Sequence, residues 1–151
     1  MGLFQSFDIS ASGMTAERFR TDIIAQNIAN VKTTRTEDGT PYRRQVVTFA
    51  EKRVSPFQEV LAGHEQKFKG TGVKVTSVQE DTTSDYIMEY DPSHPDADEN
   101  GYVSYPNVNI VTEMTNLIDA SRGYEANATA FEASKAIAQA GIQIGKAKEA
   151  H

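Results

Sequence analysis

The sequence predicts an α+β protein in which two long terminal helices pack as a coiled-coil-like pair and are joined by a small β-rich insertion. Two observations predict this architecture: apolar residues recur at helical spacing at both ends of the chain, and all five prolines lie in the middle. Proline interrupts helices because it lacks a backbone N–H and clashes with the preceding turn. We therefore expect an N-terminal helix in residues 1–31, a loop-rich β domain in residues 32–108 and a C-terminal helix in residues 109–151.

The N-terminal helix is expected from residue 3 to about residue 31, a stretch without proline and with one internal glycine, Gly13. Charged residues interrupt its apolar stripe. Met14, Ile24 and Ile28 are the candidates on this helix for burial against a partner. The segment Asn27–Asn30 is expected to end the helix and to direct the chain into the β domain, since asparagine commonly terminates helices.

Four short β-like runs lie between the turn-forming residues of the middle segment. They are expected at Tyr42–Phe49, Val73–Val78, Tyr86–Tyr90 and Tyr102–Tyr105. Gly70 and Gly72 indicate a hairpin or a bulge. They do not indicate a dinucleotide-binding loop, because the third glycine and the following helix are missing.

The C-terminal helix is expected from about residue 109 to residue 148, with Asn107 or Asn109 as its N-cap. One apolar seam follows alternating steps of four and three residues along the whole helix, and a second seam begins halfway, at Ala126. A single partner helix cannot cover both seams. The candidate assembly anchors on this helix are Met114, Leu117, Tyr124, Phe131, Ile137 and Ile142.

The length of this helix indicates that other subunits cover part of it. A helix of about 40 residues is about 60 Å long, whereas a compact chain of this size is about 40 Å across. The predicted N-terminal helix can pair with only part of it. The surplus apolar surface therefore indicates a polymer, although packing of the anchors within the chain is the alternative for each residue.

Composition excludes several classes of protein. The 151 residues include 15 Lys and Arg, 21 Asp and Glu and no Cys, and the net charge is −6. Without Cys there is no disulfide framework, thiolate zinc site or Cys nucleophile. No apolar run reaches the length of about 18 residues that a membrane span needs. The start of the chain is expected not to be a cleaved secretory signal, and the acidic balance argues against a nucleic-acid partner.

Charge is distributed unevenly along the chain. Residues 41–74 contain seven basic and three acidic side chains, whereas residues 75–121 contain ten acidic and no basic ones. Two interpretations stay open. The segments are solvated loops of opposite sign, or they are flanks that favour head-to-tail packing of identical or related subunits.

No arrangement of residues indicates catalysis or a cofactor. His64, His94 and His151 are far apart in sequence, and no metalloprotease, phosphate-binding or nucleophile-elbow motif is present. We therefore expect that the protein is not an enzyme and binds no cofactor.

One stretch resembles half of a calcium loop. Asp96, Asp98, Asn100 and Gly101 follow the pattern D-x-D-x-N-G, but the twelfth position is Asn107, which cannot supply the bidentate carboxylate of a full loop. Asp96, Asp98 and Asn100 are thus a weak metal-site candidate. The structural alternative is a turn in which the Asp side chains bind local backbone N–H groups.

Several sequence segments resemble the axial proteins of the bacterial flagellar rod and hook, particularly the proximal-rod members. They include Ala11–Ala16 (ASGMTA), Asn27–Val31 (NIANV), Asp91–Asp98 (DPSHPDAD) and Ala120–Asn127 (ASRGYEAN). Within the second segment, the family motif consists of Asn27, Ile28, Ala29 and Asn30. The resemblance extends over essentially the whole chain. One departure is Gly123, where related proteins commonly have alanine.

The resemblance implies a structural subunit of the flagellar basal body that polymerises through its terminal helices into a torque-transmitting driveshaft and export conduit. It implies export without a cleaved signal, by the flagellum-specific type III apparatus. It also implies a place in the rod, in the periplasm or cell-wall zone. The implied partners are other rod proteins, further copies of the chain, the export apparatus and the rod base, with no nucleic acid and no direct membrane span. Two alternatives remain: another axial rod subunit, or a small calcium-binding module.

Overall fold

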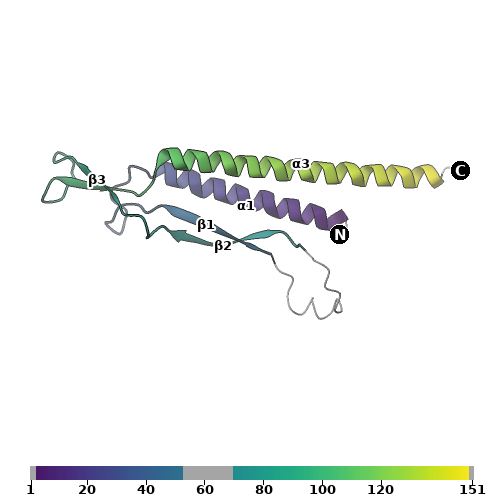
Figure 1. Cartoon of the computed structure of the whole chain (residues 1–151), viewed down its shortest axis with the longest axis horizontal. Coiled ribbons are helices and arrows are strands. Elements are labelled where there is room, and N and C mark those ends of the chain that lie inside the picture. Colours follow the sequence, from purple (N-terminus) through teal and green to yellow (C-terminus); the bar gives the residue numbers. More distant parts are fainter. Residues whose placement is uncertain (1–2, 53–69, 150–151) are drawn as a thin grey trace, which may run out of the picture. The chain divides into compact units, whose positions relative to one another are not determined.

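The protein is α+β, as the sequence predicts, with two long helices and, between them in sequence, a small β region (Figure 1). The computed structural model describes residues 3–52 and 70–149. In chain order the described elements are α1 Leu3–Ala29, β1 Gln45–Glu51, β2 Val73–Glu80, β3 Ile87–Tyr90, β4 Tyr102–Tyr105 and α3 Ile110–Glu149. The strands form two two-stranded sheets, β1 with β2 and β3 with β4. Arg53, His64, Lys67 and Lys69, which belong to segments discussed above, lie outside the described residues.

The chain divides into two compact units, and both terminal helices contribute to each. Unit 1 comprises Met1–Arg18, Phe49–Val75 and Ser121–His151, and unit 2 comprises Phe19–Thr48 and Thr76–Ala120. Unit 2 contains 13 acidic and 5 basic residues, a net charge of −8, whereas unit 1 contains 8 acidic and 10 basic residues, a net charge of +2. The division into domains at residues 31 and 108 stays a prediction.

In unit 1, α1 and α3 run antiparallel. The ring centroids of Phe7 and Phe131 are 4.9 Å apart, and further along α1 Gly13 faces the side chain of Asn127. Residues further along α1 therefore face residues that come earlier in α3. A Cβ atom on Gly13 would lie 2.5 Å from Asn127 Oδ1, so glycine permits the close approach of the helices at this point.

The start of β2 is fixed to α1 within the same unit. The backbone N–H of Val73 donates to Ser12 Oγ at 3.1 Å. The preceding Gly72 has a φ of 97°, a left-handed conformation that favours glycine, and a Cβ atom there would overlap Ser12 Oγ. The carbonyl of Gly72 accepts a hydrogen bond from Lys52 N–H. Gly72 thus occupies a backbone position that a larger residue could not adopt without strain.

Unit 2 contains the second sheet and most of the described core. β3 and β4 are antiparallel, with a register that runs from Ile87 opposite Tyr105 to Tyr90 opposite Tyr102. The buried apolar side chains of the unit are few and mostly short: Ile24, Val103, Pro106, Val108 and Ala120. The small described core agrees with the apolar content of 38%.

The structure shows how each helix is terminated. α1 ends at Ala29, two residues earlier than predicted, and Asn30 Nδ2 donates to the carbonyl of Gln26 at 2.9 Å. At the start of α3, Asn109 Oδ1 accepts hydrogen bonds from the N–H groups of Val111 and Thr112. Asn109 is therefore the N-cap of α3. No helix in the described part of the chain is long and apolar enough to span a membrane.

Candidate functional site

A buried polar network surrounds Asn27 in unit 2. The Asn27 side chain is fully buried and makes four hydrogen bonds. Its Nδ2 donates to the carbonyl of Gln45 and to Glu113 Oε2, at 2.9 and 3.0 Å. Its Oδ1 accepts from Tyr42 Oη and from Gln45 N–H, at 2.8 and 2.9 Å. Both donors and both lone pairs of the amide are thus engaged.

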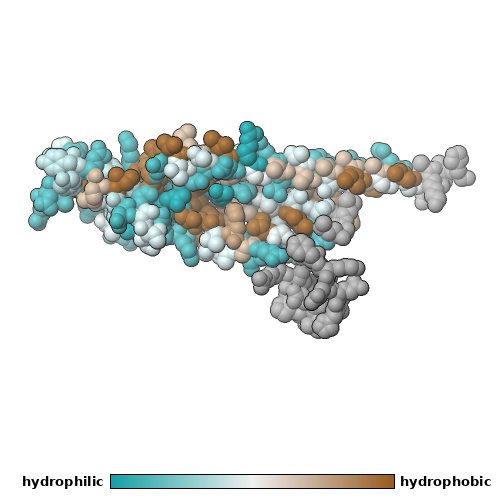
Figure 2. Space-filling model, viewed as in Figure 1, coloured by the Kyte–Doolittle hydropathy of each residue, from teal (hydrophilic) through white to brown (hydrophobic). Residues whose placement is uncertain are grey.

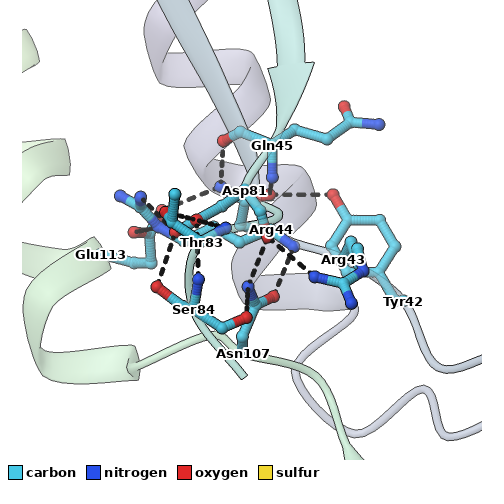
Figure 3. A network of polar contacts seen from close by, with 10 residues as sticks. Tyr42, Arg43, Arg44, Gln45, Asp81, Thr83, Ser84, Asn107 and Glu113 are labelled. Carbon is cyan, nitrogen blue, oxygen red and sulfur yellow. Dashed lines mark hydrogen bonds and ion pairs between the residues drawn. The ribbon is translucent and has the colours of Figure 1, made fainter. Parts of the chain in front are cut away.

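Glu113 projects from the first turn of α3 into this network and has no exposed surface. Arg44 Nε donates to Glu113 Oε1 at 2.8 Å, while the other carboxylate oxygen accepts from Asn27. Figure 3 shows Arg44 reaching Glu113 from the segment that precedes β1. The Arg44 side chain is 24% exposed, so the pair is partly buried, and removal of Arg44 would leave the buried charge of Glu113 without its counter-ion.

Asn107 joins two further segments to the network. Its Oδ1 accepts from Arg44 N–H at 2.9 Å, and its Nδ2 donates to the carbonyls of Asp81 and Ser84 at 2.9 and 3.2 Å (Figure 3). The Asp81 N–H in turn donates to the carbonyl of Arg44. β1 begins at Gln45 and not at Tyr42 as predicted, since the backbone of Arg44 is hydrogen-bonded within this network. We refer to Asn27, Tyr42, Arg44, Gln45, Asp81, Asn107 and Glu113 as the Asn27 network.

Two side chains of the network have shifted pKa values. The pKa of Asp81 is lowered to about 2, chiefly because its carboxylate accepts hydrogen bonds from the hydroxyls of Thr83 and Ser84. Burial raises the pKa of the Tyr42 hydroxyl, and the negative charge of Glu113 raises it further. At neutral pH the network therefore holds an ionised Asp81 and a neutral Tyr42, which donates its proton to Asn27.

The arrangement is suited to fixing positions within unit 2. Asn27 lies on α1 and Glu113 on α3, and hydrogen bonds link both to the chain just before β1. Any sliding of α1 along α3 within this unit would break the hydrogen bond from Asn27 to the buried carboxylate of Glu113. The network therefore fixes the axial register of the two helices in unit 2.

The opposite side of α3 in unit 2 is apolar and exposed. Val111, Met114 and Ile118 are 75%, 54% and 59% exposed. At 3.6 residues per turn they share one face of the helix, on the other side from the fully buried Glu113 and Ala120. Figure 2 shows this apolar patch over the first turns of α3. We refer to Val111, Met114 and Ile118 as the α3 outer face.

The C-terminal part of α3 also exposes apolar residues. Ile137, Ile142 and Ile144 are 69%, 62% and 73% exposed, and Figure 2 shows apolar side chains near this end of the helix. Ile137 and Ile144 belong to the second predicted seam. Each of its residues from Ala126 to Ile144 is exposed, so no part of the described chain covers that seam.

The predicted assembly anchors fall into two groups. Ile24 is buried, and Met14, Ile28, Leu117 and Phe131 are partly buried within the chain. The remaining four, Met114, Tyr124, Ile137 and Ile142, are exposed. The role of all nine in assembly stays a prediction.

The face of α3 that meets α1 is less apolar than the predicted first seam. It presents buried Glu113 and Ala120, and then Gly123, Asn127 and Phe131. A Cβ atom on Gly123 would lie 3.2 Å from the side chain of Glu17, a close contact. Apart from Phe131, the residues named here are small or polar, and several larger apolar residues of α3 are exposed.

The weak metal-site candidate forms a turn. Asp98 Oδ1 accepts hydrogen bonds from the N–H groups of Asn100 and Tyr102, both at 2.8 Å. Asp96 turns elsewhere, because its Oδ2 accepts from Thr34 Oγ1 and its Oδ1 lies 3.7 Å from Arg35 Nη1. Within residues 3–52 and 70–149, no group of three or more His, Asp or Glu side chains is arranged to hold a metal ion. The geometry supports the structural interpretation of this stretch.

Sequence reasoning did not identify the network partners of Asn27. Glu113 carried no clear signal in the sequence, because its burial on α3 is visible only in the structure. Its ion-pair partner Arg44 is 69 residues away in sequence, so local periodicity could not pair them.

A pair of antiparallel helices with a fixed register and an uncovered apolar face defines a structural subunit suited to assembly. Comparisons with known proteins agree. The family described as Flagella basal body rod protein matches residues 7–35, and the family described as Flagellar basal body rod FlgEFG protein C-terminal matches residues 99–144. Asn27 lies in the first matched segment and Glu113 in the second.

Relatives of nearly the same length define the family more closely. The chain is 44% identical over 150 residues to the flagellar basal-body rod protein FlgC of Borreliella burgdorferi, covering 95% of this chain and 98% of that protein. It is 41% identical over 152 residues to FlgC of Bacillus subtilis, covering 97% and 100%. It is 36% identical over 146 residues to FlgC of Escherichia coli O157:H7, again covering 97% and 100%. The chain belongs to the FlgC family of flagellar basal-body rod proteins.

Proposed function

We propose that the chain is a structural subunit of the proximal rod, which polymerises through α1 and α3 into a helical wall. The observation that carries the proposal is the exposed apolar surface of α3, in a chain that belongs to a rod-protein family. Burial of a large apolar side chain contributes about 1.5–3 kcal/mol. The α3 outer face alone offers three such side chains to a neighbour.

Torque transmission requires subunits that do not deform under load, and the Asn27 network supports this role. Displacement of α1 against α3 in unit 2 would break the hydrogen bond from Asn27 Nδ2 to the buried carboxylate of Glu113. A buried acceptor that loses its donor costs free energy, and this cost opposes sliding of the helices. The polymer then transmits rotation through helices of fixed register and surrounds the conduit for exported proteins.

The partners proposed for the chain are other rod proteins and further copies of itself, with the export apparatus and the rod base as neighbours during assembly. Its proposed location is the rod, in the periplasm or cell-wall zone, after export through the flagellar apparatus without cleavage. We propose that it has no enzymatic activity. The support is the internal use of the polar groups in the Asn27 network, where the carboxylates of Glu113 and Asp81 are engaged with neighbouring groups.

Incorporation into basal bodies tests the proposal. Cells that lack their own copy of the gene would produce the tagged chain, and isolated basal bodies would be probed for the tag. We expect the wild-type chain to be incorporated and motility to be restored. A triple variant Val111→Asp, Met114→Asp and Ile118→Asp should be excluded, because three charges then occupy the surface that a neighbour covers.

The matched control is Thr112→Asp, which adds a charge at an exposed position of the same helical turn outside the α3 outer face. The control should enter basal bodies as the wild-type chain does. Circular dichroism of the purified variants shows whether each retains its helices. Absence of the wild-type chain from basal bodies, or normal incorporation of a folded triple variant, would contradict the proposal.

A further inference from the structure

An apolar groove of about 350 Å³ lies beside the start of α3 in unit 2. Six of its eight lining residues are apolar, and they include Val31, Ile87, Val108 and Ile110. Ile110 also begins α3, immediately before Val111 of the α3 outer face. Groove and outer face are therefore adjacent, and we refer to them together as the receptor surface.

The described part of α1 leaves the end of α3 without an opposing helix in unit 1. Phe131 packs against Phe7, which lies four residues after the first described residue of α1. Because the helices are antiparallel, Leu3, four residues before Phe7, lies opposite a position about four residues after Phe131, near residue 135. α3 continues to Glu149, 14 residues further. Figure 1 shows α3 continuing beyond the start of α1. We refer to residues 135–149 as the α3 tail.

Unit 2, which carries the receptor surface, and the α3 tail differ in net charge. The groove itself is lined by one basic and one acidic residue, Lys32 and Glu89. Unit 2 as a whole has a net charge of −8. The α3 tail contains Lys135, Lys146 and Lys148 and one acidic residue, Glu149, for a net charge of +2. Charges of opposite sign favour an encounter between these two surfaces. A contact between two receptor surfaces would instead bring two strongly acidic units together.

We propose that the α3 tail of one copy docks on the receptor surface of a second copy, with Ile137 and Ile144 covering the groove and the α3 outer face. The proposal rests on the proposed function and specifies the surfaces that identical subunits use. The two surfaces differ, so the contact is heterologous. Such a contact does not close after two subunits, and it extends into a ring or a helical polymer.

Complementary variants test this contact in the purified full chain. The receptor variant carries Ile110→Asp and Met114→Asp, and the tail variant carries Ile137→Asp and Ile144→Asp. All four positions are exposed. The matched control carries Thr112→Asp and Gln139→Asp, two exposed polar positions on the same helix. Analytical ultracentrifugation then measures the size of each species over a range of concentrations.

We expect the wild-type chain and the control to form species larger than dimers as concentration rises. Each variant alone should associate at least tenfold more weakly. An equimolar mixture of the two variants should form a 1:1 heterodimer and nothing larger, because one intact tail then meets one intact receptor surface. Raising the salt concentration from about 50 mM to about 500 mM should weaken wild-type association at least tenfold, since it screens the opposite charges.

Two results would overturn the proposal and leave the proposed function standing. One is a mixture of variants that stays monomeric while the wild-type chain associates, which would place the contact elsewhere. The other is a wild-type chain that stays monomeric up to about 1 mM, although the tagged chain enters basal bodies. The receptor surface would then be covered by a different rod component.

Discussion

Replacement of Asn27 by alanine should destabilise the protein strongly. The fully buried amide makes four hydrogen bonds, and the variant leaves Glu113 Oε2, Tyr42 Oη and both backbone polar groups of Gln45 without that partner. A neutral hydrogen bond contributes about 1 kcal/mol net and one to a charged group about 1.5–3 kcal/mol. Since water can enter part of the vacated space, we expect a loss of about 3–5 kcal/mol.

Helix propensity offsets a small part of this loss. Alanine is better than asparagine in a helix interior by up to about 0.7 kcal/mol. The free energy of unfolding of a typical domain is only about 5–15 kcal/mol, so the expected loss is a large part of the total.

Urea denaturation followed by circular dichroism measures this effect. The matched control is Gln26→Ala, an exposed position next to Asn27 on α1, which should change the free energy of unfolding by less than about 0.5 kcal/mol. A loss below about 1 kcal/mol for Asn27→Ala would mean that the Asn27 network does not hold the helices in register.

A second variant separates the hydrogen bonds from the size of the side chain. Asn27→Asp keeps the shape but removes both Nδ2 donors and places a carboxylate beside Glu113. It should be at least as destabilising as alanine at neutral pH. The additional change Glu113→Gln exchanges the two groups, so that the carboxylate is at residue 27 and the amide at residue 113. The double variant should lose less free energy of unfolding than the sum of the losses of the two single variants.

Three further predictions concern packing, pH and helix capping. Gly13→Ala should lower the free energy of unfolding by about 1–3 kcal/mol in urea denaturation, because its Cβ would lie 2.5 Å from Asn127 Oδ1. Gly141→Ala is the matched control: its Cβ would meet no neighbouring atom within 4 Å, and it should raise the free energy of unfolding by up to about 1 kcal/mol. Because the fold lowers the pKa of Asp81 to about 2, its ionised carboxylate stabilises the protein above the ordinary pKa of aspartate, and this stabilisation is lost as the pH drops from about 4 towards 2. The urea midpoint should fall over that pH range, and Asp81→Asn should reduce the fall. Asn109→Ala removes the α3 N-cap and should cost about 1 kcal/mol in thermal unfolding.

The helices were predictable because their signals are local. The absence of proline and the helical spacing of apolar residues placed both helices within two residues of their observed ends. The sequence predicts either Asn107 or Asn109 as the N-cap of α3. Only the structure could decide between them, since it shows that the side chain of Asn107 donates instead to the carbonyls of Asp81 and Ser84.

The Asn27 network could not be predicted, because it depends on contacts between segments that are distant in sequence. Asn27 and Glu113 are 86 residues apart. Apolar periodicity found the seams of α3, but it could not show which of them the chain covers itself. The actual contact with α1 includes Gly123 and Asn127, residues that a search for apolar stripes passes over.

The α3 outer face should be open in the single chain and covered in the rod. The chain contains no cysteine, so one introduced at Ile118 is the sole thiol. Its labelling by a maleimide can be compared between the purified chain and isolated basal bodies, with a cysteine at the fully buried Val103 as the unreactive control. We predict rapid labelling at residue 118 in the free chain and protection in basal bodies. Equal labelling in both states would contradict the account.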